Sequence, residues 1–191
     1  MSIKIEFELG DEDLKRFRAM FDEARDVAKS MDRDEILAAA RRLVEPAAAR
    51  KPDGFIRTRI DGLRKLVEML EDETWKLPPE DAERVLHALA YFVNPNDLIP
   101  DQTPGLGFLD DAIVAELVLR LLADEVEAYD EFVKFREAET ERRRSAGLPI
   151  DITQEDWLAD RRAALHARFR SRRSSRSPLG SGGWTVKGLG F

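Results

Sequence analysis

The hydrophobic positions along the chain first alternate and then change to a helical period. Ile3, Ile5, Phe7 and Leu9 alternate with charged residues, a pattern typical of a short strand with one solvated face. From Asp11 onward, apolar residues recur every three or four positions, which is the spacing of amphipathic helices. The pattern predicts an all-α fold, a compact bundle of about six helices preceded by a short N-terminal β-strand.

Helix boundaries in the first half of the chain follow from capping residues and helix breakers. A helix is expected to begin at Asp32, because Glu35 three residues later completes a variant of the capping box. The Lys51–Gly54 segment predicts a turn before the next helix. A further helix is expected from Pro79, since proline is favoured in a first turn, and it should stop near Asn94.

Two further helices complete the predicted bundle. A single long helix is expected from Leu109 to about Arg144, with a broad apolar face in its first half and a wholly charged end. The last helix is expected to begin with Thr153 as its cap and Asp156 three residues later. Beyond Arg170, the Ser-, Arg- and Gly-rich composition predicts disorder.

Composition excludes several classes of function. The chain has 43% hydrophobic and 36% charged residues, which is typical of a globular protein with a strongly solvated surface. It has no cysteine, so disulfides, thiolate nucleophiles and cysteine-based metal sites are excluded. No apolar run approaches the roughly 18 residues that a membrane span needs, and residues 1–10 do not resemble a signal peptide. A cytoplasmic location is therefore expected.

Charge is distributed unevenly along the chain. All 38 Asp and Glu residues lie at or before Asp160, whereas residues 161–191 carry eight Lys and Arg. We interpret this as a helical domain over residues 1–170 followed by a disordered basic tail over 171–191. Such a tail either attracts polyanions, including nucleic acid, or folds back onto the acidic body.

The connection between the fourth and fifth predicted helices is the main candidate for chemistry. It is dense in proline, glycine, asparagine and aspartate, and four of its carboxylates are candidate metal ligands: Asp97, Asp101, Asp110 and Asp111. Oxygen ligands at short, irregular spacing suit a divalent cation such as Mg²⁺. The simpler interpretation is that these aspartates cap helix ends and complement the helix dipole, which needs no ligand.

The same connection carries a family resemblance. Its candidate motif or ligand-binding residues are Asn94, Pro95, Asp97, Pro100, Asp101, Gly105, Gly107, Asp110 and Asp111. The order Asn-Pro-Asn-Asp-Leu-Ile-Pro-Asp, then Pro-Gly-Leu-Gly and Leu-Asp-Asp, resembles the signature of the YkvA-like bacterial family, catalogued as domain of unknown function 1232. The resemblance covers about residues 85–125. It implies a small helical domain and supplies no activity, because none is established for the family.

The C-terminus is a candidate docking peptide. After a Gly180–Gly183 linker, the chain ends in a hydrophobic segment whose candidate contact residues are Trp184, Val186, Leu189 and Phe191. Such a segment on a tether predicts a protein partner. Alternatively, its first residues add a strand beside the N-terminal strand, within one chain or between the subunits of a homo-oligomer.

These observations favour a non-enzymatic interaction or scaffold protein. No nucleophile constellation is predicted, since His87 and His166 are the two histidines and neither lies in a Ser–His–acid pattern. No cofactor is firmly predicted, and a divalent cation such as Mg²⁺ is the candidate considered above. The alternatives are a metal-binding protein or metal-dependent enzyme that uses the four aspartates, and a polyanion-binding protein that uses the basic tail. Peripheral membrane contact is a further open alternative.

Overall fold

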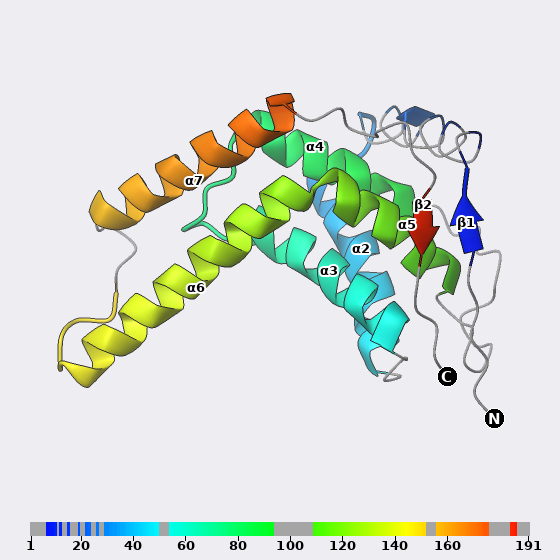
Figure 1. The fold of residues 1–191 in the computed structure, drawn as a ribbon. Coiled ribbons are helices and arrows are strands. Elements are labelled where there is room, and N and C mark those ends of the chain that lie inside the picture. Colours follow the sequence, from blue (N-terminus) through cyan, green and yellow to red (C-terminus); the bar gives the residue numbers. More distant parts are fainter. Residues whose placement is uncertain are drawn as a thin grey trace.

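The fold is mostly helical, which confirms the predicted all-α class (Figure 1). It is seen in a computed structural model that describes residues 7–10, 12, 15, 19, 22–23, 26, 29–49, 54–93, 109–151, 156–175 and 184–186. The helices are α2 (Arg33–Ala49), α3 (Gly54–Glu71), α4 (Pro79–Ala90), α5 (Leu109–Leu121), α6 (Ala123–Ser145) and α7 (Asp156–Ser175), with a 3₁₀ turn η1 (Tyr91–Val93). The predicted helix after Asp11 falls largely outside the described residues.

Helices α2, α3, α4 and α5 pack together as the body of the molecule. Their buried side chains recur at helical spacing, as in α3, where Ile60, Leu63 and Leu66 are fully buried. Gly62 allows α3 and α5 to approach closely, because a Cβ at this position would lie 2.3 Å from a methyl group of Leu119. The body therefore follows the periodicity of the sequence closely.

The predicted starts of α2 and α4 are confirmed by their local hydrogen bonds. The Asp32 carbonyl accepts from the Glu35 and Ile36 amides at 3.1 and 3.2 Å, and the Asp32 amide donates to the Glu35 carboxylate at 3.3 Å. This is the reciprocal half of a capping box. Helix α4 begins with Pro79 in its first turn, where the missing amide hydrogen is not needed.

The predicted single helix from Leu109 to about Arg144 is wrong, because the chain changes direction at Leu122. This residue has φ −105° and ψ 19°, and it divides the segment into α5 and α6. Leu122 is itself completely buried. Helix α5 packs on α3, whereas α6 packs mainly on α7, so the bend allows each half to meet a different neighbour.

Helices α6 and α7, with the chain between them, extend from the body, and we call this part of the molecule the arm. Helix α6 leads away from the body and α7 leads back toward α4 (Figure 1). Helix α7 continues to Ser175, so disorder immediately after Arg170 is not observed. The extra turn is stabilised by Arg172 and Arg173, which bind carboxylates of α6 and α4.

Two short strands complete the described residues. Strand β1 (Phe7–Leu9) pairs antiparallel with β2 (Trp184–Val186), with Phe7 opposite Val186 and Leu9 opposite Trp184. The pairing brings the first and last described segments of the chain together.

Candidate functional site

The predicted aspartate site falls mainly outside the described residues. Those outside are Asn94, Pro95, Asp97, Pro100, Asp101, Gly105 and Gly107 of the connection, and Leu189 and Phe191 of the C-terminal peptide. Asp110 and Asp111 lie in the first turn of α5, and Trp184 and Val186 belong to β2. Whether the four aspartates converge on a cation or cap helix ends therefore stays a prediction.

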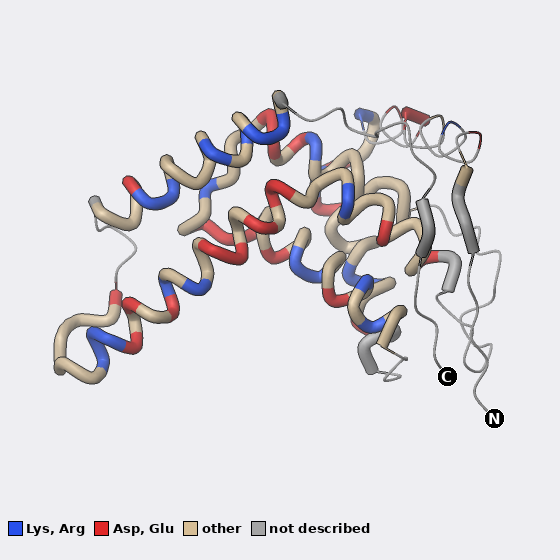
Figure 2. The backbone as a smooth tube through the Cα atoms, viewed as in Figure 1, with Lys and Arg blue, Asp and Glu red and all other residues tan. Residues whose placement is uncertain are grey.

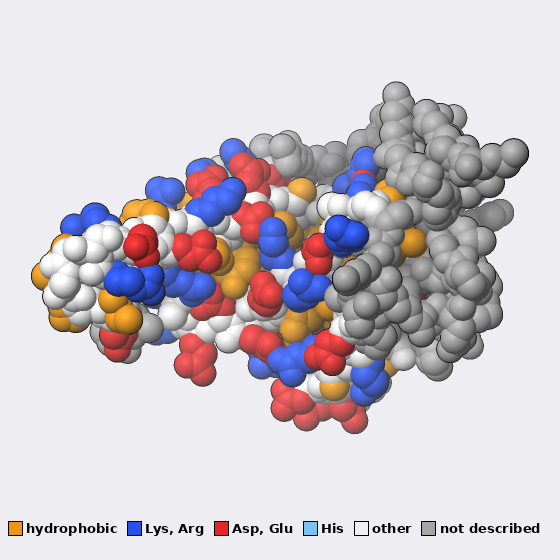
Figure 3. Space-filling model, turned by 90° about the horizontal axis from the view of Figure 1, so that it is seen from below, with side chains coloured by type: hydrophobic (Ala, Val, Ile, Leu, Met, Phe, Trp, Pro, Cys, Tyr) orange, Lys and Arg blue, Asp and Glu red, His pale blue; other side chains and the backbone are white. Residues whose placement is uncertain are grey.

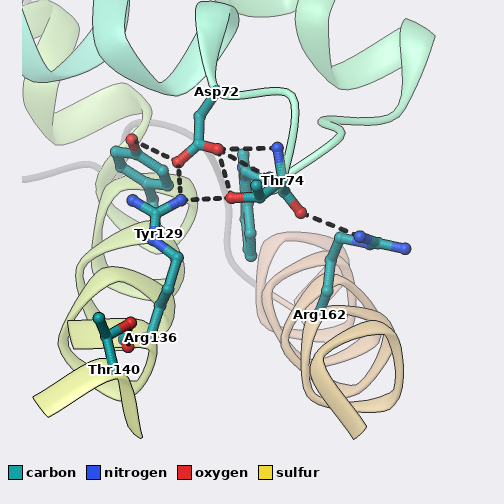
Figure 4. Close-up of polar contacts among 7 residues, drawn as sticks. Asp72, Thr74, Tyr129, Arg136, Thr140 and Arg162 are labelled. Atoms are coloured by element: carbon teal, nitrogen blue, oxygen red, sulfur yellow. Dashed lines mark hydrogen bonds and ion pairs between the residues drawn. The ribbon is translucent and has the colours of Figure 1, made fainter. Parts of the chain in front are cut away.

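A different polar cluster lies where the body meets the arm (Figure 4). We call it the junction cluster, and it consists of Asp72, Thr74, Tyr129, Arg136 and Arg162. Its centre is the turn that follows α3. One oxygen of the Asp72 carboxylate accepts hydrogen bonds from the Thr74 amide at 2.8 Å, the Thr74 hydroxyl at 2.5 Å and the Trp75 amide at 3.1 Å. This is the local bonding by which aspartate organises a turn.

The second oxygen of Asp72 binds residues of α6. Tyr129 donates its hydroxyl at 3.1 Å and Arg136 donates at 2.6 Å, and Arg136 also contacts the Thr74 hydroxyl. Burial alone would raise the pKa of the Asp72 carboxyl, but the hydrogen bonds from Thr74 and Arg136 outweigh burial and hold this pKa below its usual value. Burial and the Asp72 charge raise the pKa of Tyr129 above its usual value, so the phenol stays a donor.

Helix α7 closes the junction cluster from the other side. Arg162 donates to the Thr74 carbonyl at 2.9 Å (Figure 4). Beside this contact, Trp75 is fully buried, with Phe132 of α6 and His166 of α7 at centroid distances of 5.0 and 4.2 Å. The turn after α3 is thus held between the two helices of the arm.

The contacts of the junction cluster hold the arm to the body, and they leave the Asp72 carboxylate fully engaged, which does not favour proton transfer. The five hydrogen bonds on Asp72 satisfy its lone pairs, and Arg136 neutralises its charge. A hollow of about 760 Å³ opens next to it along α6. Its lining residues are Thr74, Arg136, Glu137, Thr140, Glu141, Arg144, Ile150 and Asp151. Chemically, this arrangement can accommodate a partner surface that combines apolar and charged groups.

Sequence reasoning missed the junction cluster. The local signal was present, because Asp72 and Thr74 at the end of an apolar helix form an Asp-x-Thr pattern that favours a side-chain turn. The contact between Asp72 and Arg136 left no recognisable pattern in the sequence, since Arg136 is 64 positions away and lies in a run of charged residues. Only the packing of α6 against the end of α3 brings the two together.

Among the described residues, no group of three or more His, Asp or Glu is placed to hold a metal ion. Within the same part of the chain, no helix has the length and apolar character to cross a membrane.

Comparison with known proteins gives a match over the second half of α4, the connection and most of α5. Residues 84–117 match the family described as "Protein of unknown function (DUF1232)". The chain is 44% identical over 45 residues to "Uncharacterized membrane protein YkvA" of Bacillus subtilis (strain 168). That alignment covers 24% of this chain and 42% of the relative, so the chain spans less than half of the relative's length. No solved structure matches. The resemblance inferred from the motif is confirmed.

Proposed function

We propose that this chain, whose residues 84–117 belong to the DUF1232 family, is a non-enzymatic interaction protein whose contact surface is the end of the arm. The observation that carries the proposal is a rigid turn with two outward-facing apolar side chains. Leu148 and Ile150 are 48% and 52% exposed. Figure 3 shows hydrophobic side chains at the end of the arm, next to intermixed acidic and basic groups. Apolar side chains held in water on a fixed scaffold are typical of contact surfaces.

The turn that carries these side chains is tightly bonded. Gly147 has φ +66°, and the Leu148 amide donates to the Arg143 carbonyl at 3.0 Å, as in a Schellman motif. The Arg143 guanidinium donates to the Pro149 carbonyl at 3.3 Å and lies 5.6 Å from the centroid of the Trp157 ring. The exposure of the two apolar side chains is therefore imposed by the backbone geometry.

Support for a non-enzymatic role comes from the pairing of two acids, Asp72 in the turn after α3, which is partly buried, and Glu116 of α5, which is buried. Arg136 binds Asp72, and Arg59 binds Glu116 at 2.8 Å. Each of these carboxylates is engaged by a guanidinium, which occupies the oxygens that a general base would present to a substrate. The body consequently supplies a stable scaffold, and the arm supplies the surface that a partner contacts.

Site-specific photo-crosslinking in cells tests the proposal. A photoreactive amino acid at Leu148 is expected to give a discrete crosslinked protein, and a second substitution, Ile150→Asp, is expected to reduce its yield at least fivefold. The matched control carries the photoreactive residue at Glu68, an exposed position on α3. Equal adduct patterns from positions 148 and 68, or insensitivity to Ile150→Asp, would contradict an interaction through the arm.

The metal alternative is a separate proposal. It rests on the four aspartates of the predicted site, and it predicts that Mg²⁺, Mn²⁺ or Ca²⁺ raises the melting temperature of the full chain. The shift should disappear in a variant with Asp97→Asn and Asp101→Asn, because oxygen charge sets cation affinity. Asp130→Asn, a control on α6 outside the connection, should keep the shift, and persistence of the shift in the Asp97→Asn and Asp101→Asn variant would show a non-specific effect.

We further propose a cytoplasmic location and a second protein contact through Trp184, Val186, Leu189 and Phe191. The relative from Bacillus is described as a membrane protein, so peripheral membrane contact is retained as the competing location. Polyanion binding through the tail is less well supported, because Arg168, Arg170 and Arg173 already bind carboxylates of this chain.

A further inference from the structure

Helix α7 covers a surface formed by α6, α4 and the turn after α3, which we call the groove, and its arginines bind carboxylates of α6 and α4 on either side. Figure 2 shows Asp and Glu along these two helices. The apolar side of α7 is a narrow stripe of Leu158, Leu165 and Phe169, which are buried to 2% exposure or less. Trp75 and Phe132 lie below this stripe as the floor of the groove. A stripe of three side chains buries little apolar area, so the ion pairs on either side of it must contribute to the specificity with which α7 is bound.

Arginines flank the stripe of α7 on both sides. Toward one edge, Arg168 binds Glu131 at 2.5 Å and Arg172 binds Glu127 at 2.8 Å. These pairs are partly exposed and contribute little to stability. An acidic helix in the same position would, however, bring like charges next to Glu127 and Glu131.

The opposite edge contains two fully buried carboxylates. Asp81 of α4 is 0% exposed and Glu125 of α6 is 1% exposed. Arg170 binds Asp81 at 2.9 Å, and Arg173 binds Asp81 at 2.6 Å and Glu125 at 3.0 Å. Arg84 lies 3.4 Å from Glu125 and compensates only this carboxylate. Without the two α7 arginines, a buried charge would lose its main partners, which is strongly unfavourable.

We propose that this acid-edged groove, defined by Trp75, Phe132, Asp81, Glu125 and Glu131, is a recognition site for basic amphipathic helices and that α7 is its occupant within the chain. The inference goes beyond the proposed contact at the end of the arm, because it assigns a second surface and the chemistry of the partner that would bind there. The partner presents a helix with an apolar stripe between arginines, and it binds by displacing α7. Helix α7 thereby acts as an autoinhibitory segment.

Competition with α7 sets the affinity of the site. A tethered helix has an effective concentration in the millimolar range. An added helix of equal affinity must therefore be present above that concentration to displace α7 from the wild-type chain. Residues 145–151, the described part of the connection to α7, are exposed, so their side chains need not leave the core when α7 is displaced. Weakening α7 should therefore strengthen binding of an added helix.

The test uses the full chain and a fluorescent peptide with the sequence of residues 156–175. In a release variant, Arg170→Gln and Arg173→Gln weaken the internal helix. The matched control, Arg142→Gln and Arg144→Gln, removes the same charge from exposed positions of α6. We expect the peptide to bind the release variant at least tenfold more tightly than either the wild type or the control. A peptide with Gln at the positions of Arg170 and Arg173 should lose at least tenfold in affinity.

Equal affinity of the peptide for the release and control variants would overturn the proposal, as would equal affinity of the two peptides. A second measurement serves if the release variant does not fold. A peptide with a photoreactive residue at the position of Phe169, at millimolar concentration, should crosslink to residues 125–132 of the wild-type chain. Crosslinking elsewhere would also overturn the proposal. If the peptide fails while position 148 still captures a partner, the groove proposal is wrong and the interaction function stands.

Discussion

Replacing Asp72 with alanine is expected to lower the free energy of unfolding by about 3–4 kcal/mol, because several buried donors lose their acceptor together. The Thr74 and Trp75 amides, the Tyr129 hydroxyl and the Arg136 guanidinium all bind this one carboxylate. Chemical denaturation followed by Trp fluorescence measures the change, since the fully buried Trp75 lies within the same turn.

Asp130→Ala is the matched control for this substitution. Asp130 also pairs with a cation, Lys65 at 2.7 Å, but both side chains are 35% exposed. An exposed pair contributes about 0–1 kcal/mol, so this variant should remain close to the wild type. Similar losses in Asp72→Ala and Asp130→Ala would show that the junction cluster does not hold the arm to the body. Asp72→Asn, which keeps acceptor oxygen but loses the charge, should fall between the two.

Acidification is expected to destabilise the protein through His166. Burial, followed by the charges of Arg162 and Arg170, lowers the pKa of this imidazole from 6.5 to about 4. The unfolded chain therefore binds a proton at a higher pH than the folded chain does. Stability due to the neutral ring is complete above pH 6.5 and is lost as the pH falls from 6.5 toward 4.

Over the accessible part of this range, the loss should be about 2 kcal/mol between pH 6.5 and pH 5, at 1.36 kcal/mol for each pKa unit. Unfolding measured at several pH values in wild type and His166→Leu isolates the contribution, because leucine does not titrate. The difference between the two curves should be flat above pH 7 and slope below pH 6.5. Parallel curves for wild type and His166→Leu would show that the imidazole ionises as freely in the fold as in the unfolded chain.

The helix starts could be read from the sequence because their chemistry is local. Asp32 and Glu35 exchange backbone and side-chain bonds within one turn, and Pro79 needs no partner for a missing amide hydrogen. The apolar periodicity of α3 also predicted which side chains are buried. In each case, the residues that decide the structure lie within four positions of one another.

The bend at Leu122 and the acidic edge of the groove could not be read in this way. Nothing near Leu122 breaks a helix, so the change of direction results from α5 meeting α3 and α6 meeting α7. Asp81 lies in the first turn of α4, where an acid is favourable for local reasons, but its burial depends on Arg170 and Arg173, about 90 positions later. The junction cluster, which sequence reasoning missed, is formed in the same way, by the pairing of residues that lie far apart in the sequence.

The bend at Leu122 also fixes the rotation of α6 about its own axis, and with it the direction in which the side chains of the arm point. Each residue of an α-helix advances the side-chain direction by about 100° and the axis by about 1.5 Å. One residue inserted directly after Leu122 would leave residues 84–117 unchanged in sequence but rotate Glu125 and Phe132 away from their present partners. The angular register of α6, rather than its length, therefore decides which surface the arm offers.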